Sequence, residues 1–77
     1  MPKVQVDDFA GRLKQLRLAA GLTQKAAAEA LKMPEAMWQK YESGERVPSL
    51  GKAMVLADLF NVSLDYLAGR SENPDKP

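Results

Sequence analysis

The sequence predicts an all-α fold, a compact five-helix bundle that forms one domain. Apolar residues recur at helical spacing along almost all of the 77 residues, and residue types that start or stop helices interrupt this pattern. Beyond a stub at 4–6, no segment alternates apolar and polar residues as a strand would. A chain of this length buries only about 60% of its unfolded surface, so we expect a single unit with little spare stability.

The first expected helix covers residues 7–20 and is followed by Gly21, which favours the left-handed conformation at a helix end. Its apolar residues fall at i, i+4, i+7 and i+11, and these are Phe9, Leu13, Leu16 and Ala20. Asp7 or Asp8 is placed to cap the start of this helix.

The second and third helices form a closely packed pair. Thr23 caps the second, which runs over 24–31 and contains four alanines that allow a neighbouring helix to approach closely. The third begins near Pro34, because proline is tolerated in a first helical turn, and it ends at Ser43 before Gly44.

Two further helices follow a short loop. Ser49 caps the fourth, which ends at Asn61, and Ser63 caps a short fifth helix that Gly69 terminates. The apolar residues that these helices are expected to turn inward are Ala53, Leu56, Ala57, Phe60, Leu64 and Leu67.

The composition excludes several classes of function. The chain has no cysteine and no histidine, which excludes disulfides and thiolate sites and removes the commonest metal ligand and general base. We therefore expect no enzymatic activity, no metal and no other cofactor. No apolar run approaches the roughly 18 residues of a membrane span, and the first residues lack the apolar stretch of a secretory signal. A soluble cytoplasmic protein is expected.

Four motifs occur in order at a characteristic spacing: Gly21-Leu22-Thr23-Gln24, Tyr41-Glu42-Ser43-Gly44, Val47-Pro48-Ser49-Leu50 and Asn61-Val62-Ser63-Leu64-Asp65-Tyr66-Leu67. Together they resemble the phage-repressor-like (Cro/XRE) helix-turn-helix DNA-binding family over about residues 9–69. The resemblance implies a lambda-repressor-like DNA-binding domain at 7–69, with the helix-turn-helix at 24–43. An N-terminal arm at 1–6 and a flexible polar tail at 70–77 would flank it.

The same resemblance implies how the two helices of the motif pack. Ala28 lies where the family has a small residue, and Trp38 faces Ala27 in the core, an interpretation we favour over base stacking. Lys32 occupies the turn position where the family usually has glycine. Either Lys32 adopts a positive φ, or Pro34 reshapes the turn.

An ion pair between Arg17 and Glu42 is also implied, and it would tie the first helix to the end of the third. If the pair is buried, removal of either partner would cost about 3–5 kcal/mol. The alternative is two solvated charges.

By resemblance, the residues that face base edges in the major groove are Glu35, Ala36, Gln39 and Lys40. Lys40 can donate to guanine, Gln39 can pair with adenine, and Ala36 can contact a thymine methyl group. Glu35 can accept from cytosine N4, or it can serve only to complement the positive N-terminus of its own helix.

The expected phosphate contacts lie on either side of this helix, at Gln24, Lys25, Met37, Ser43, Gly44 and Arg46. Gln24 opens the second helix, where its amide and free backbone N–H groups can bind a phosphate. For each lysine taken alone, a solvated surface charge is the simpler interpretation.

The charges nearly cancel, because 11 Lys and Arg face 10 Asp and Glu and leave a formal +1. We therefore expect weak binding by a monomer and a homodimer on a pseudo-palindromic operator, with half-sites about 34–36 Å apart. Candidates for an apolar dimer patch are Leu50, Met54, Val55 and the region around Tyr66. Ordinary core packing of these residues is the alternative.

The sequence thus favours a sequence-specific transcriptional regulator that acts as a repressor in a prokaryotic cell or phage-infected host. Its partner would be double-stranded DNA, with no small-molecule ligand and no membrane. The alternative is a protein-interaction module on the same fold, such as an antitoxin or an accessory subunit of a regulator. The near-neutral charge, Glu35 and an exposed Met37 motivate that alternative.

Overall fold

A computed structural model describes residues 6–75 of the chain. Five helices follow one another in it: α1 (Val6–Ala19), α2 (Gln24–Ala30), α3 (Glu35–Ser43), α4 (Leu50–Leu59) and α5 (Leu64–Leu67). No strand occurs within these residues, so the predicted all-α class is confirmed. The stub at 4–6 and the arm at 1–6 fall mostly outside the described residues, and Val6 itself is helical.

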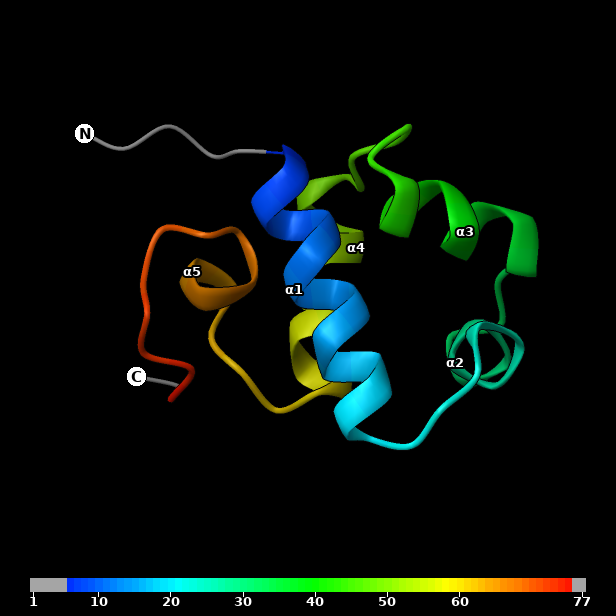
Figure 1. Ribbon diagram of the computed structural model, residues 1–77, viewed down its shortest axis with the longest axis horizontal. Helices are drawn as coiled ribbons and strands as arrows, with labels where there is room; N and C mark the ends of the chain where they lie inside the picture. Colours follow the sequence, from blue (N-terminus) through cyan, green and yellow to red (C-terminus); the bar gives the residue numbers. More distant parts are fainter. Residues whose placement is uncertain (1–5, 76–77) are drawn as a thin grey trace.

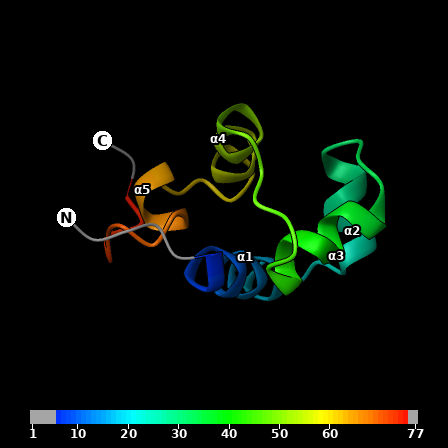
Figure 2. The same ribbon diagram turned by 90° about the horizontal axis from the view of Figure 1, so that it is seen from above.

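The long helix α1 runs through the middle of the molecule (Figure 1). The pair α2 and α3 lies at one end of the longest axis, and α5 lies at the other end (Figure 1). Seen from above, α4 faces α1 across the centre (Figure 2). The side chains of Leu13, Trp38, Leu56 and Leu67 are fully buried between these helices. Helix α3 of this pair packs against α1, and α5 packs against α1 and α4 at the other end.

Side-chain caps begin three of the helices, as predicted. Thr23, Ser49 and Ser63 each accept a hydrogen bond from the backbone N–H three residues further on, at 3.0, 3.2 and 3.0 Å. Gly69 ends α5 with a φ of +81°, and a Cβ atom there would lie 2.7 Å from Cβ of Asp8. Glycine is required at this position for both reasons.

The start and end of α1 differ from the prediction. The helix already includes Val6, so Asp7 and Asp8 lie within its first turn and not before it. Ala20, expected on the buried stripe, is exposed because the chain turns away after Ala19 toward α2.

Part of the expected polar tail, at 71–74, forms hydrogen bonds with the body of the protein. Arg12 on α1 donates through Nη1 to the carbonyl of Ser71 at 2.7 Å and through Nη2 to the Glu72 carboxylate at 2.8 Å. The backbone N–H of Ser63 donates to the carbonyl of Pro74 at 2.8 Å. Residues 72–75 are exposed, as the polar composition suggested, but donors on α1 and before α5 bind carbonyl groups of this segment. Residues 76–77 lie outside the described part of the chain.

The turn between α2 and α3 resolves the alternatives for Lys32. Its φ is +55°, so this lysine adopts the left-handed conformation. Pro34 precedes α3 with a φ of −62°, and its carbonyl accepts from the N–H of Trp38 at 3.3 Å. The turn keeps the glycine-type geometry, with a lysine at an unfavourable position.

Replacing Lys32 by glycine is expected to raise the free energy of unfolding by about 0.5–1 kcal/mol. The left-handed conformation costs a residue with a Cβ about 1–2 kcal/mol, and the entropy of glycine in the unfolded chain offsets part of the gain. Urea denaturation measures the change. Lys32→Ala is the control, because it removes the charge and keeps the Cβ atom. Equal stabilisation by both variants would contradict this explanation.

Candidate nucleic-acid interface

Helix α3 presents one face to the core and the opposite face to solvent. Trp38 and Tyr41 are buried on the inner side. The rings of Phe9 and Tyr41 pack edge to face, with their centres 6.3 Å apart. The four residues expected to face base edges are all exposed on the outer side: Glu35, Ala36, Gln39 and Lys40. A shallow hollow of about 270 Å³ on this outer side is lined by Ala36, Gln39, Lys40, Ser43 and Glu45.

A buried ion pair holds the end of α3 against α1. Arg17 Nε donates to Glu42 Oε2 at 2.6 Å, and Arg17 Nη2 donates to Glu42 Oε1 at 3.2 Å. The two side chains are 10% and 4% exposed, so the pair is not a solvated surface contact. The third nitrogen of the guanidinium, Nη1, donates to the carbonyl of Leu22 at 2.8 Å. Arg17 thereby fixes the α1–α2 turn as well.

Two further donors bind the same carboxylate. Trp38 Nε1 donates to Glu42 Oε2 at 2.5 Å, and Gln24 Nε2 donates to Glu42 Oε1 at 3.1 Å. The core position expected for Trp38 is correct, but its indole also has this polar role. The i, i+4 spacing of Trp38 and Glu42 on one helix was a signal in the sequence for their contact. We call Arg17, Gln24, Trp38 and Glu42 the Glu42 network.

The Glu42 network determines the charge state of its carboxyl group. Burial is the largest single influence and raises the pKa of Glu42, since it disfavours the ion. The hydrogen bonds from Arg17, Trp38 and Gln24 and the charge of Arg17 outweigh burial together, so the pKa of Glu42 lies below its ordinary value. Glu42 is therefore ionised at neutral pH and accepts from all of its donors.

A family model described as a helix-turn-helix domain matches residues 8–69, which is most of the chain. The chain belongs to the Cro/XRE-like helix-turn-helix family. The match includes α2, the turn and α3, and it extends over α4 and α5. The resemblance recognised in the motifs is confirmed.

Relatives from this family have names that describe transcriptional regulators. The chain is 44% identical over 61 residues to the HTH-type transcriptional regulator ImmR of Bacillus subtilis, covering 79% of this chain and 48% of ImmR. It is 37% identical over 67 residues to the uncharacterized regulator YobD of the same organism, covering 87% and 60% of the two chains. It is 36% identical over 59 residues to the cryptic phage CTXphi transcriptional repressor RstR of Vibrio cholerae, covering 77% and 53%.

The chain thus spans about half to three fifths of the length of these relatives. None of the helices in residues 6–75 has the length and apolar character that a bilayer crossing requires.

The polar groups that follow α3 form hydrogen bonds within their own turn, which the sequence analysis did not expect. The hydroxyl of Ser43 donates to the carbonyl of Lys40 at 3.1 Å. The backbone N–H groups of Gly44 and Arg46 donate to carbonyls of α3, at 3.3 Å in each case. These N–H groups are satisfied within the turn, and the side chain of Arg46 is exposed beside them.

Two other expected phosphate contacts are placed differently from the prediction. Gln24 is half-buried and its amide donates to Glu42, so it contributes to the Glu42 network. Met37 is half-buried and packs against the hydrophobic core, so the interpretation of an exposed Met37 is wrong. Its apolar side chain follows the inner side of α3. Lys25 is exposed on α2, as expected.

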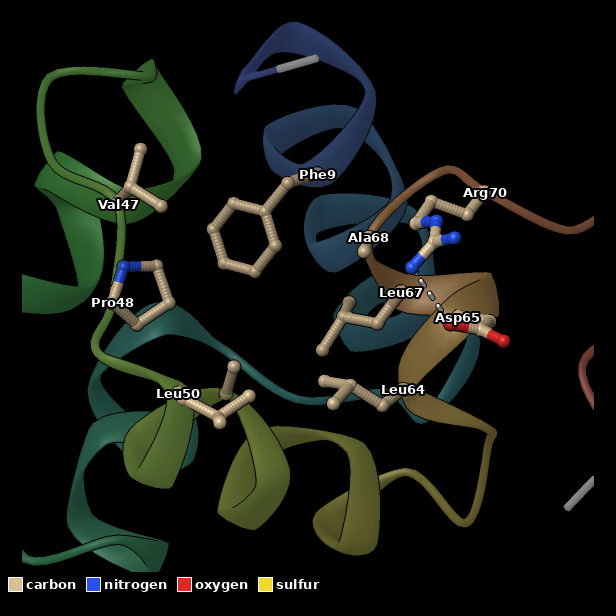
Figure 3. A pocket seen from close by; sticks show the side chains of 10 residues that line it. Phe9, Val47, Pro48, Leu50, Leu64, Asp65, Leu67, Ala68 and Arg70 are labelled. Carbon is tan, nitrogen blue, oxygen red and sulfur yellow. Dashed lines mark ion pairs between the residues drawn. The ribbon is translucent and has the colours of Figure 1, made fainter. Parts of the chain in front are cut away.

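An apolar groove of about 250 Å³ lies between the start of α1, the α3–α4 loop, α4 and α5 (Figure 3). Phe9, Leu64 and Leu67 form its floor and sides, while Val47 and Leu50 stand at its rim, 56% and 68% exposed (Figure 3). We call this feature the α4–α5 groove.

The apolar residues considered for a dimer patch divide between the surface and the core. Leu50, Met54 and Val55 are exposed on α4, which excludes ordinary core packing for them. Tyr66 packs at the edge of the core, and the guanidinium carbon of Arg12 lies 4.3 Å from the centre of its ring.

Replacing Glu42 by glutamine is expected to lower the free energy of unfolding by about 3–5 kcal/mol at pH 7, because Arg17 then stays buried without a counter-charge. The matched control is Glu72→Gln, which breaks the pair between Arg12 and a carboxylate that is 92% exposed and should cost under about 1 kcal/mol. Equal losses of unfolding free energy in the two variants would contradict the claim that burial makes the Arg17–Glu42 pair the stronger one.

The same pair predicts a pH dependence of stability. The pKa of Glu42 is lower in the folded state, so its contribution to the free energy of unfolding is complete above the ordinary glutamate pKa of about 4.3. This stabilisation is lost as the pH falls from there through the lower pKa of the folded state. Urea denaturation between pH 7 and pH 3 should show that the difference in free energy of unfolding between wild type and Glu42→Gln becomes smaller in acid. A difference that stays constant over this range would show that the pKa of Glu42 is not lowered by folding.

Proposed function

We propose that this chain is a sequence-specific DNA-binding transcriptional repressor that inserts α3 into the major groove of an operator. The observation that carries the proposal is an exposed outer face of α3 on a helix whose position is fixed by the buried Glu42 network. The major groove of B-DNA accepts one α-helix, which reads base edges with the residues of its first turns. The names of the relatives, one of them a phage repressor, support this function.

Three exposed residues of α3 would read bases directly. Lys40 is suited to the O6 and N7 acceptors of guanine, and Gln39 to the donor and acceptor pair of adenine. Ala36 is small enough to contact a thymine methyl group. The proposed phosphate contacts are the exposed cations Lys25 on α2 and Arg46 after α3, one on each side of the reading face.

The formal charge of +1 makes one copy a weak DNA ligand, so we propose that two copies bind a pseudo-palindrome. The α4–α5 groove is the proposed contact with the second copy. It carries both a hollow and protruding apolar side chains, Val47 and Leu50, on one face, which suits a twofold interface. Asp65 and Arg70 add opposite charges at its edge.

The alternative function as a protein-interaction module has less support than the sequence alone suggested. One of its motivations was an exposed Met37, and that residue packs inward. Binding to random duplex at low salt separates the two functions, because non-specific DNA binding is normally detected below millimolar protein. Selection of duplexes from a random pool then identifies the operator.

Replacing Lys40 by alanine is expected to weaken binding to the selected operator by about 1–3 kcal/mol and to leave binding to random DNA unchanged. The matched variant is Arg46→Ala, which should weaken both DNAs alike and reduce the salt dependence by about one charge. Fluorescence anisotropy at several salt concentrations measures both effects. Equal losses on operator and random DNA from Lys40→Ala would count against base reading.

Replacing Leu50 by aspartate is expected to abolish dimer formation and cooperative operator binding, while binding to one half-site stays intact. A charge in the α4–α5 groove cannot be buried in an apolar interface without a large cost. The control is Leu18→Asp on α1, an equally apolar side chain that is 57% exposed and does not line the groove. Sedimentation velocity with and without DNA gives the oligomeric state. A dimer that survives Leu50→Asp would exclude this interface.

A further inference from the structure

Glu35 and Gln39 lie one helical turn apart on the outer face of α3, separate from the Glu42 network. Gln39 Nε2 donates to Glu35 Oε2 in a long hydrogen bond of 3.4 Å. Both side chains are exposed on the face proposed to enter the groove. An ionised carboxylate offers only acceptors, so it can bind only the NH₂ end of the amide. The contact therefore favours the orientation in which the NH₂ end of the Gln39 amide points toward Glu35.

In this orientation, the Gln39 amide keeps one hydrogen-bond acceptor and one donor available for a base. One N–H of Gln39 is engaged, and the carbonyl oxygen and the second N–H remain. Adenine presents a donor at N6 and an acceptor at N7, which complement these two groups. Guanine presents two acceptors, O6 and N7, and would place one of them against the amide oxygen. An amide without Glu35 can rotate and offer both N–H groups to guanine.

We propose that Glu35 is a positioning residue that makes Gln39 select adenine over guanine, an inference that rests on the proposed function. This role accounts for a carboxylate on a face that must approach phosphates. Glu35 lies in the first turn of α3, where the helix dipole favours negative charge. It acts on specificity through Gln39 and contacts no base itself.

The hollow beside Gln39 gives the base edge room to approach. Ala36 and Gln39 both line it, and the methyl side chain of Ala36 leaves the space on the side of the amide open. Lys40 lines the same hollow and brings a positive charge that offsets the carboxylate of Glu45 there. The hollow thus brings together the amide of Gln39, the methyl group of Ala36 and the cation of Lys40.

The test uses the operator selected from a random pool by the wild-type chain. Each base pair of one half-site is changed in turn to the other three, and dissociation constants are measured for wild type, Gln39→Ala and Glu35→Gln. Wild type should prefer adenine over guanine by about tenfold or more at the one position where Gln39→Ala abolishes the preference. Glu35→Gln should reduce that preference below about threefold, because a neutral amide at 35 both donates and accepts and no longer fixes residue 39.

A control separates specificity from general damage. Glu35→Gln removes a negative charge from the DNA-facing side, so its affinity for random duplex should equal or exceed that of wild type. Its unfolding midpoint should fall only slightly, since Glu35 is exposed and loses only its interaction with the N-terminus of α3. Lys40→Ala should alter the preference at a different base pair and leave the adenine position unchanged.

The outcomes distinguish this inference from the function on which it rests. A wild-type chain that enriches no sequence would refute the proposed function itself. Specific binding in which Glu35→Gln keeps the full adenine preference would overturn the positioning role alone. So would a change of preference at another base pair, since Glu35 would then read that base directly. A preference for any base other than adenine at the Gln39 position would overturn the inference as well.

Discussion

The position of α3 depends on one carboxylate, that of Glu42, which accepts hydrogen bonds from three side chains. Arg17 comes from α1, Gln24 from the start of α2 and Trp38 from α3 itself. Burial of an ion in a small domain is unfavourable unless every acceptor is used. Among the described residues no buried side-chain nitrogen or oxygen lacks a partner. A shift of α3 would break several of these bonds together, so the cluster favours a single arrangement of the three helices.

Packing around Trp38 complements this polar constraint. The indole is fully buried among small residues of α2, Ala27 and Ala28, which allow the two helices to lie close together. On its other side the ring meets Phe60 edge-on, with the centres 6.3 Å apart. One large side chain opposite two small ones fills the interior, while its N–H reaches the carboxylate at the edge. The apolar core and the buried ion pair thus meet at Trp38, whose helix α3 packs against both α2 and α1.

Much of this arrangement could be predicted from the sequence, because its determinants are local. Thr23, Ser49 and Ser63 identify helix starts by the chemistry of their hydroxyl groups. The partners of Arg12 could not be predicted in this way, since its contacts with residues near 71 depend on how α1 and α5 pack. The hydrogen bond from Gln24 to Glu42 was missed for the same reason, because it joins helices whose crossing the sequence does not define. The positive φ of Lys32 was one of two open alternatives, and only the backbone geometry decides between them.

The hydrogen-bonded segment at 71–74 also determines how the domain can be attached to a surface or a label. Its carbonyl groups bind Arg12 and the backbone before α5, at the end of the molecule remote from α3 (Figure 1). A dye or a surface linkage introduced at residue 75 would therefore start on the side away from the outer face of α3. Immobilised in that orientation, the protein would present its helix-turn-helix outward to nucleic acid in solution.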